Sequence, residues 1–216
     1  MTHHPRLRRG KKVEIMTPTL PTGPDTWHDA SAIAVFVPGG ACPAALCDIP
    51  MQQATLPSLG YRLAGLAGDG AQDPEWAMPA GQPDLTRKAG AIVVEPDGRI
   101  WVIEPTNHYW GTVASFPKGT LDNETCPRLT ALREVFEETG LVVQLGEHLA
   151  DVQRDDAIVR LYRARRLSGR PVDMGWESQS VRLVPPGQLE GVMAGSKEGS
   201  FLAVAQRLRP VEGGGA

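Results

Sequence analysis

The chain has 216 residues, and its 22 Lys and Arg against 25 Asp and Glu give a formal net charge of −3 at pH 7. This near balance gives no general electrostatic signal for nucleic acid, and no apolar run approaches the roughly 18 residues of a membrane span. The length exceeds one ordinary domain of about 100–200 residues but is short for two, which favours one main domain with an extension.

Cysteine usage bears on the cellular compartment. The chain has three cysteines, Cys42, Cys47 and Cys126. Their number is odd and their spacing is not that of a metal site. A secreted disulfide framework is therefore not indicated, and a reducing cytoplasm is expected.

The N-terminal part of the chain divides into two segments. Residues 1–28 combine a basic stretch at 6–12 with Pro, Thr and Gly, and we expect a disordered tail there, with a phosphate-binding or nucleic-acid-binding arm as the alternative. Residues 29–86 contain a strand-like run at 31–37 and then lack a sustained period. They are expected to form an N-terminal extension or small subdomain, which packs on the main domain, makes a homodimer contact or covers the substrate.

The main domain is expected over residues 87–210 and begins with a β-hairpin pattern. Residues 89–95 and 100–104 have strand composition, and the turn residues Pro, Asp and Gly separate them. The loop that follows carries Tyr109, Trp110 and Lys118. The aromatic side chains are candidates for stacking on a base, with plain packing as the alternative, and Lys118 is a candidate for contact with a phosphate.

A helix is expected over residues 126–139. Thr125 can cap its N-terminus, Pro127 suits its first turn, and Gly140 suits the left-handed residue that ends it. At about 100° per residue, Glu134, Glu137 and Glu138 share one face of this helix. The roughly opposite face carries Leu129, Leu132, Val135, Phe136 and Thr139.

The three glutamates have two interpretations. On a solvated surface, like charges at this spacing cost only about 0.2–0.5 kcal/mol per pair. In a pocket, carboxylates about 4 Å apart repel by on the order of 4 kcal/mol at an effective dielectric near 20, and need a metal or a proton. Spacing alone leaves both open.

Beyond the helix, the pattern predicts more sheet and two short helices. Alternating strands are expected at 142–145, 149–153 and 157–165, another strand at 176–184, helices at 188–193 and 201–208, and a disordered tail at 211–216. The basic stretch that contains Arg160 and Arg166 is expected to be a solvated edge.

The segment from Gly119 to Leu141 resembles the Nudix box. Gly119 is followed, after thirteen residues, by Arg-Glu-Val-Phe-Glu-Glu-Thr-Gly-Leu at 133–141, and the one departure is Thr125 in place of a glutamate. The resemblance implies an α/β fold, a Nudix-like α/β/α sandwich with a mixed sheet, to which the N-terminal extension is added. In place of that glutamate, Thr125 could support the start of the helix as its N-cap.

The resemblance also implies the chemistry: hydrolysis of a nucleoside diphosphate linked to another moiety, with Mg²⁺ or Mn²⁺. Glu134, Glu137 and Glu138 would hold the metal, and the carbonyl of Gly119 could add a ligand. Arg133 would orient the cluster, and since it lies four residues before Glu137 its guanidinium can hold that carboxylate. Dinucleoside polyphosphates, ADP-ribose and nucleoside triphosphates are all substrate candidates.

The general base is left open among three residues. Glu137 and Glu138 are the candidates inside the box, and Glu177 is a candidate outside it, with a solvated acid at a strand start as its alternative. A catalytically impaired Nudix-like module that binds or regulates is the alternative to an enzyme. The intact Glu134, Glu137 and Glu138 favour the enzyme.

Overall fold

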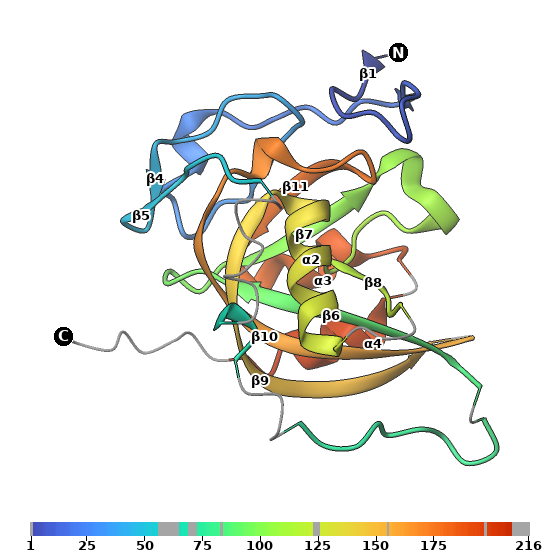
Figure 1. Ribbon diagram of the computed structural model, residues 1–216. Helices are drawn as coiled ribbons and strands as arrows, with labels where there is room; N and C mark the ends of the chain where they lie inside the picture. Colours follow the sequence, from blue (N-terminus) through green and yellow to red (C-terminus); the bar gives the residue numbers. More distant parts are fainter. Residues whose placement is uncertain are drawn as a thin grey trace.

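The computed structural model (Figure 1) describes residues 2–55, 65–68, 73–82, 84–122, 126–154, 156–196 and 198–208. Its centre is a seven-stranded mixed sheet in the order β3-β11-β7-β6-β10-β9, with β8 paired to β6 beside this path. Its strands are β3 Ala34–Phe36, β6 Thr86–Val94, β7 Ile100–Pro105, β8 Lys118–Thr120, β9 Leu141–Arg154, β10 Ala157–Gly169 and β11 Ser178–Val184.

Helices lie on both faces of this sheet (Figure 1). They include α2 Pro127–Thr139, α3 Leu189–Met193 and α4 Gly199–Ala205, with short 3₁₀ turns at η1 Pro24–Thr26, η3 Thr106–Gly111, η4 Pro171–Asp173 and η5 Pro186–Gln188. One buried cluster packs Val135 of α2 against the sheet, and a second packs Phe201 of α4 against the other face. The predicted α/β/α sandwich with a mixed sheet is confirmed. Within the described ranges, no helix has the length and apolar character needed to cross a bilayer.

The expected hairpin between β6 and β7 forms only at its turn. The two strands pair at Val94 and Ile100, whereas β6 runs parallel to β10 along its whole length. The segment that ends in β8 lies between them, because Ser115 bridges to Ile103 of β7 and β8 pairs antiparallel with β6. This insertion brings β8 under α2, where the candidate site forms.

Helix α2 starts and ends close to the predicted residues. Cys126 is its N-cap residue and Pro127 its first residue, one position later than expected. Gly140 adopts φ of 71°, and its N–H donates to the carbonyl of Phe136 at 2.8 Å. A residue with a side chain would be strained in this left-handed conformation, so Gly140 ends the helix. The proposed capping residue Thr125 lies outside the described residues.

The strands after α2 are longer than expected. The two predicted strands at 142–145 and 149–153 form one continuous strand, β9. Its pairing with β10 contains register shifts, so the break in the sequence pattern does not end the strand. The expectation of a solvated basic edge is wrong for two arginines. Arg160 is 3% exposed and pairs with Asp151 at 2.7 Å, and Arg166 is 1% exposed and pairs with Glu95 at 2.6 Å.

The N-terminal residues pack onto the main domain. Within the expected disordered tail, β1 Thr2–His3 pairs antiparallel with β2 Glu14–Ile15, so the structure corrects the expectation of disorder there. In the expected subdomain, β3 joins the edge of the central sheet beside β11, and β4 Ala45–Leu46 and β5 Ile49–Pro50 form a separate pair. The tail expected at 211–216 lies outside the described residues.

Candidate metal centre

The close packing of Gly119 on Glu134 places the Glu134 carboxyl group against β8. A Cβ built on Gly119 would lie less than 3.0 Å from all three carboxyl atoms of Glu134. Real Cβ atoms do not approach other atoms so closely, and hence only glycine lets this carboxylate reach the β8 backbone. Two residues that are fifteen positions apart in the box therefore meet in space.

Glu138 is buried, so of the two interpretations of the three glutamates a fully solvated face does not hold for this residue. It is 9% exposed, and its Oε2 accepts a hydrogen bond from the Lys118 N–H at 2.8 Å. Three residues of helix turn by about 300°, so Glu138 lies only about 60° from the buried Val135. Burial, then the negative charges of Glu134 and Glu177, raise the pKa of Glu138 to about 8, although Lys118 opposes the shift.

Glu134 is intermediate in exposure between the buried Glu138 and the exposed Glu137 and Glu177. Its side chain is 13% exposed. Burial is the largest cause that raises the pKa of Glu134 to about 7, and the carboxylates of Glu137, Glu177 and Asp122 raise it further, whereas Arg133 lowers it. A carboxyl group with such a pKa is under strong electrostatic stress when it is ionised.

The structure places Arg133 beside different carboxylates from the one expected. The Arg133 guanidinium lies 3.2 Å from Asp122 and 3.8 Å from Glu134. Its positive charge acts to lower the pKa of Glu137 at longer range, without an ion pair between these two described residues. Asp122 was missed by sequence reasoning. The sequence could have indicated Asp122, because it is an acidic residue three positions after Gly119 in the loop that leads into α2.

Glu177 reaches the cluster through the loop before β11. The Gly175 N–H donates to the Glu137 carbonyl at 2.7 Å, which ties this loop to the last turn of α2. Partial loss of hydration and the charge of Glu137 raise the pKa of Glu177, and Arg8 opposes the shift. Loss of hydration likewise raises the pKa of Glu137, which Arg133 opposes. Glu137 and Glu177 both have exposed side chains.

The side chain of Lys118 points away from the carboxylate cluster, whereas its main-chain N–H donates to Glu138 within it. Its Nζ contacts the hydroxyl of Ser115, lies 3.6 Å from Glu198 and packs 5.2 Å from the ring centroid of Phe201. Glu198 also pairs with Arg154 at 2.7 Å. These partners hold the amine beside α4, so Lys118 contacts the carboxylate cluster through its main-chain N–H.

Two exposed aromatic residues stand on η3. Tyr109 and Trp110 are 71% and 81% exposed, and their rings form an edge-to-face pair with centroids 5.9 Å apart. Asn107, His108 and Trp110 have φ of 55°, 51° and 57°, a region that side chains rarely adopt. Backbone strain that the surrounding structure maintains is a common feature of binding loops.

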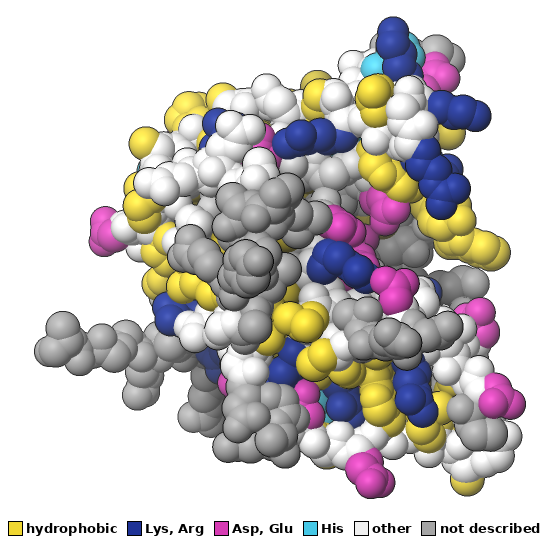
Figure 2. Space-filling model, in the orientation of Figure 1, with side chains coloured by type: hydrophobic (Ala, Val, Ile, Leu, Met, Phe, Trp, Pro, Cys, Tyr) yellow, Lys and Arg dark blue, Asp and Glu magenta, His cyan; other side chains and the backbone are white. Residues whose placement is uncertain are grey.

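The donor set suits a hard cation. In the described part of the chain, no three His, Cys, Asp or Glu side chains are gathered tightly enough to hold an ion as they stand. The chemistry nevertheless fits, because Glu134, Glu137, Glu138 and Glu177 offer only oxygen donors, and the pKa of each is raised. A divalent cation would offset their repulsion. Figure 2 shows acidic side chains on the same face as the basic N-terminal segment and below it.

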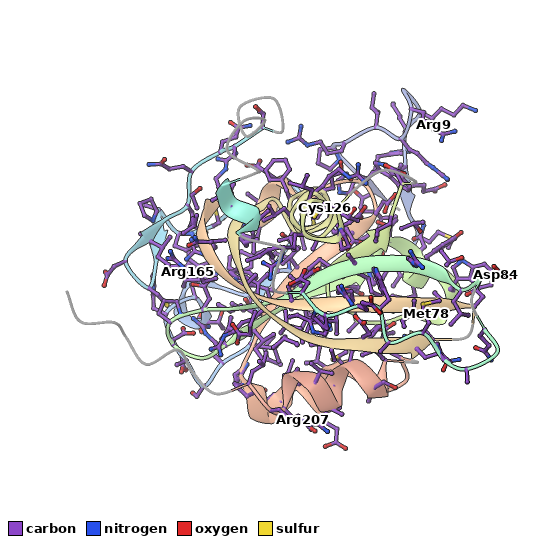
Figure 3. The ribbon with its side chains drawn as sticks, turned by 60° about the horizontal axis from the view of Figure 1, so that its bottom comes forward. Arg9, Met78, Asp84, Cys126, Arg165 and Arg207 are labelled. Carbon is purple, nitrogen blue, oxygen red and sulfur yellow. The ribbon has the colours of Figure 1, made fainter. Side chains whose placement is uncertain are left out.

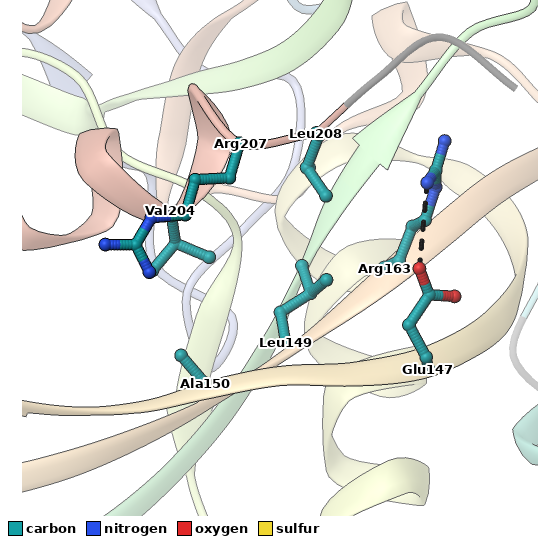
Figure 4. Close-up of a pocket in the computed structure, with 7 residues that line it drawn as sticks. All are labelled: Glu147, Leu149, Ala150, Arg163, Val204, Arg207 and Leu208. Carbon is teal, nitrogen blue, oxygen red and sulfur yellow. Dashed lines mark ion pairs between the residues drawn. The ribbon is translucent and has the colours of Figure 1, made fainter.

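A pocket on the other side of the sheet takes no part in this cluster. It has a volume of about 380 Å³ and lies between β9, β10 and α4 (Figure 4). Its lining includes the ion pair of Arg163 and Glu147 at 3.6 Å and the apolar side chains of Leu149 and Val204. None of the candidate site residues lines it.

Comparison with known proteins gives the family. The NUDIX domain model matches residues 84–203, more than half of the chain, and these residues include α2, β8 and the carboxylate cluster. The chain therefore belongs to the Nudix family, as the box predicted. The matched region starts three residues before the expected main domain and ends seven residues before its expected end.

The individual proteins that resemble this chain share limited sequence identity with it. The m7GpppN-mRNA hydrolase dcap-2 of Caenorhabditis elegans is 34% identical over 94 residues, which cover 42% of this chain and 12% of that protein. A NUDIX hydrolase from Nitrosomonas europaea is 21% identical with a TM-score of 0.48, over 57% of this chain and 69% of that one. A C. elegans Ap4A hydrolase is 17% identical with a TM-score of 0.45, over 56% and 94%.

Proposed function

We propose that the chain is a metal-dependent pyrophosphohydrolase that cleaves a nucleoside diphosphate linked to another moiety. The observation that carries the proposal is the grouping of Glu134, Glu137, Glu138 and Glu177 on one side of α2, with the carboxyl pKa of each raised. Acidic groups with raised pKa values are typical of functional sites, and a bound cation would offset their repulsion.

Mg²⁺ or Mn²⁺ is the proposed cofactor. Glu134, Glu137 and Glu138 would hold it. Gly119 packs against Glu134, and its carbonyl could add a fourth oxygen donor. Such an ion neutralises diphosphate charge and lowers the pKa of a bound water. The Lys118 amide holds the Glu138 carboxylate in place, and Arg133 holds Glu134 and Asp122.

The proposed general base is Glu137 or Glu177. A base must reach the attacking water and accept its proton. Glu138 is buried and one of its oxygens already accepts the Lys118 N–H. Glu137 and Glu177 are exposed, and each has a raised pKa, which favours proton acceptance near neutral pH.

The proposed substrate is a nucleotide derivative whose base stacks on Tyr109 or Trp110. The two rings are exposed and form an edge-to-face pair, and a base would cover apolar surface that is otherwise in water. Dinucleoside polyphosphates, ADP-ribose and nucleoside triphosphates all carry such a base. The relative that hydrolyses m7GpppN-mRNA adds a capped dinucleotide to the compounds worth testing.

The test is a hydrolysis assay of these substrates with Mg²⁺ and with Mn²⁺. Glu137→Gln or Glu177→Gln, whichever removes the general base, is expected to lower kcat by at least about a hundredfold, a size typical of acid–base catalysis. Glu190→Gln is the matched control, because Glu190 is an exposed acid on α3. Binding without turnover of any substrate would support the impaired module instead.

A further inference from the structure

The N-terminal arm, residues 2–16, is anchored beside the carboxylate cluster. His4 is 2% exposed, and its ring lies against the backbone of Ser178, the residue after Glu177. Nδ1 of this ring accepts the Arg6 N–H at 2.9 Å, and the His4 N–H donates to the Val13 carbonyl at 2.9 Å. The buried ring therefore attaches the arm to the loop that carries Glu177.

A second anchor joins the arm to the aromatic loop. The Met16 N–H donates to Oδ1 of Asn107 at 2.8 Å, and Nδ2 of Asn107 donates to the Glu14 carbonyl at 2.8 Å. Asn107 lies on η3, two residues before Tyr109. The arm consequently spans from the carboxylate cluster to the proposed base-binding rings.

Between the two anchors the arm is strongly basic. Residues 6–12 contain Arg6, Arg8, Arg9, Lys11 and Lys12, and all five are exposed. In Figure 2 basic side chains lie at the upper right, above the acidic side chains of the same face. Five positive charges beside a site that would bind diphosphate attract an anion.

Arg8 is the basic residue that faces the site. Its guanidinium carbon lies 4.7 Å from the ring centroid of Trp176, and its charge acts on Glu177. Stacking uses the face of a guanidinium, whereas its N–H groups lie in the plane and can hold a phosphate in bidentate fashion. Arg9, in contrast, lies at the outer end of the arm (Figure 3).

We propose that the N-terminal arm is part of the substrate site, and that Arg8 binds a phosphate group of the substrate that lies outside the metal centre. This inference rests on the proposed hydrolase function and narrows its substrate class. The preferred substrate carries phosphates beyond the pair that the metal centre holds, as dinucleoside polyphosphates and nucleoside triphosphates do. ADP-ribose has only that pair and would make less use of Arg8.

The kinetic test compares Arg8→Ala with Arg9→Ala, which removes a charge of the same kind from the same arm. With a dinucleoside tetraphosphate, Arg8→Ala is expected to raise KM about tenfold and change kcat by less than about twofold, because Arg8 touches the substrate away from the reacting bond. Arg9→Ala should change KM by less than about twofold. Equal effects of the two substitutions would overturn the assignment of Arg8.

A binding test without turnover separates this inference from the hydrolase function. Inorganic tripolyphosphate is titrated into the protein with Mg²⁺ in a calorimeter, and inorganic phosphate serves as the short anion. Arg8→Ala should weaken the binding of tripolyphosphate about tenfold and the binding of phosphate by a smaller factor. If the protein hydrolyses nucleotides but binds tripolyphosphate equally well with and without Arg8, the hydrolase function stands and the inference about the arm fails.

Two further substitutions separate charge from packing. Arg8→Met keeps an unbranched side chain against Trp176 but has no charge, and should bind tripolyphosphate as weakly as Arg8→Ala. Arg8→Lys keeps the charge and should recover part of the binding. Wild-type affinity in Arg8→Met would show that Arg8 only packs the arm, and would overturn its role as a phosphate ligand.

Discussion

Gly119 and Glu134 are in contact across β8 and α2 so closely that a Cβ on the glycine would overlap the Glu134 carboxyl group. Gly119→Ala would therefore push the Glu134 carboxyl group away from β8. Since Glu134 is a proposed metal ligand, we expect kcat/KM to fall at least about a hundredfold. The measurement is steady-state hydrolysis at saturating Mg²⁺. Gly187→Ala is the control, because a Cβ there meets no atom within 4 Å, and an unchanged rate in Gly119→Ala would contradict the contact's importance.

Metal should stabilise the protein most at alkaline pH. The pKa of Glu138 is raised from 4.5 to about 8 on folding, so its ionisation opposes folding. The penalty is absent below pH 4.5 and complete above about pH 8. Metal-free protein should thus lose thermal stability as the pH rises through this window, and Mg²⁺ or Mn²⁺ should raise Tm more at its upper end.

The control for this pH dependence is Glu138→Gln, which cannot ionise. Its metal-free Tm should vary less between about pH 5 and pH 8 than the Tm of the unmodified chain. Melting curves in EDTA measure both proteins. Parallel curves for the two proteins over that range would show that Glu138 does not carry the effect.

Local spacing explains which parts of the site could be predicted. The i, i+3 and i+4 positions put Glu134, Glu137 and Glu138 near one another whatever the helix packs against. How deeply each carboxylate is buried depends on what packs on α2. Sequence alone therefore could not show that Glu138 turns toward the Lys118 amide while Glu137 stays exposed.

Long-range contacts explain what sequence reasoning missed. The arm was expected to be disordered because of its composition, yet it is held by long-range contacts. Asn107 forms hydrogen bonds with Met16 and Glu14, which lie 91 and 93 residues away, and the His4 ring lies against Ser178. The direction of the Lys118 side chain depends likewise on Glu198. Neither partner has a local signal in the sequence, whereas the strands and α2 are encoded by local periodicity.

Glu104 should stabilise the fold near neutral pH and lose this contribution in acid. Burial alone would raise its pKa, but hydrogen bonds from Ser180, His108 and Thr19, with the charge of Arg182, lower the pKa to about 2. A lowered carboxyl pKa stabilises the folded state above the ordinary value of 4.5, and this contribution is lost as the pH falls toward about 2.

Glu104→Gln tests this contribution. It should reduce the free energy of unfolding at pH 7 by about 1.5–3 kcal/mol, the range for hydrogen bonds to a charged group. The difference from the unmodified chain should shrink as the pH falls from 4.5 toward 2. Urea unfolding at several pH values measures it, with Glu190→Gln as the exposed control; a difference independent of pH would argue against the ionised form of Glu104 as its source.

The order of the N-terminal arm can be tested by limited proteolysis with trypsin, which cleaves after Arg and Lys. His4 is buried and its neighbour His3 is exposed, so the two histidines form a matched pair. His4→Ala removes the ring that lies against Ser178, and cleavage within residues 6–12 should become at least about fivefold faster, because cleavage follows the population of the open arm. His3→Ala should leave the rate close to that of the unmodified chain. Mass spectrometry of the early fragments locates the cuts, and equally rapid cleavage of all three proteins would mean that the arm is not held by His4 and that Arg8 has no fixed position beside Trp176.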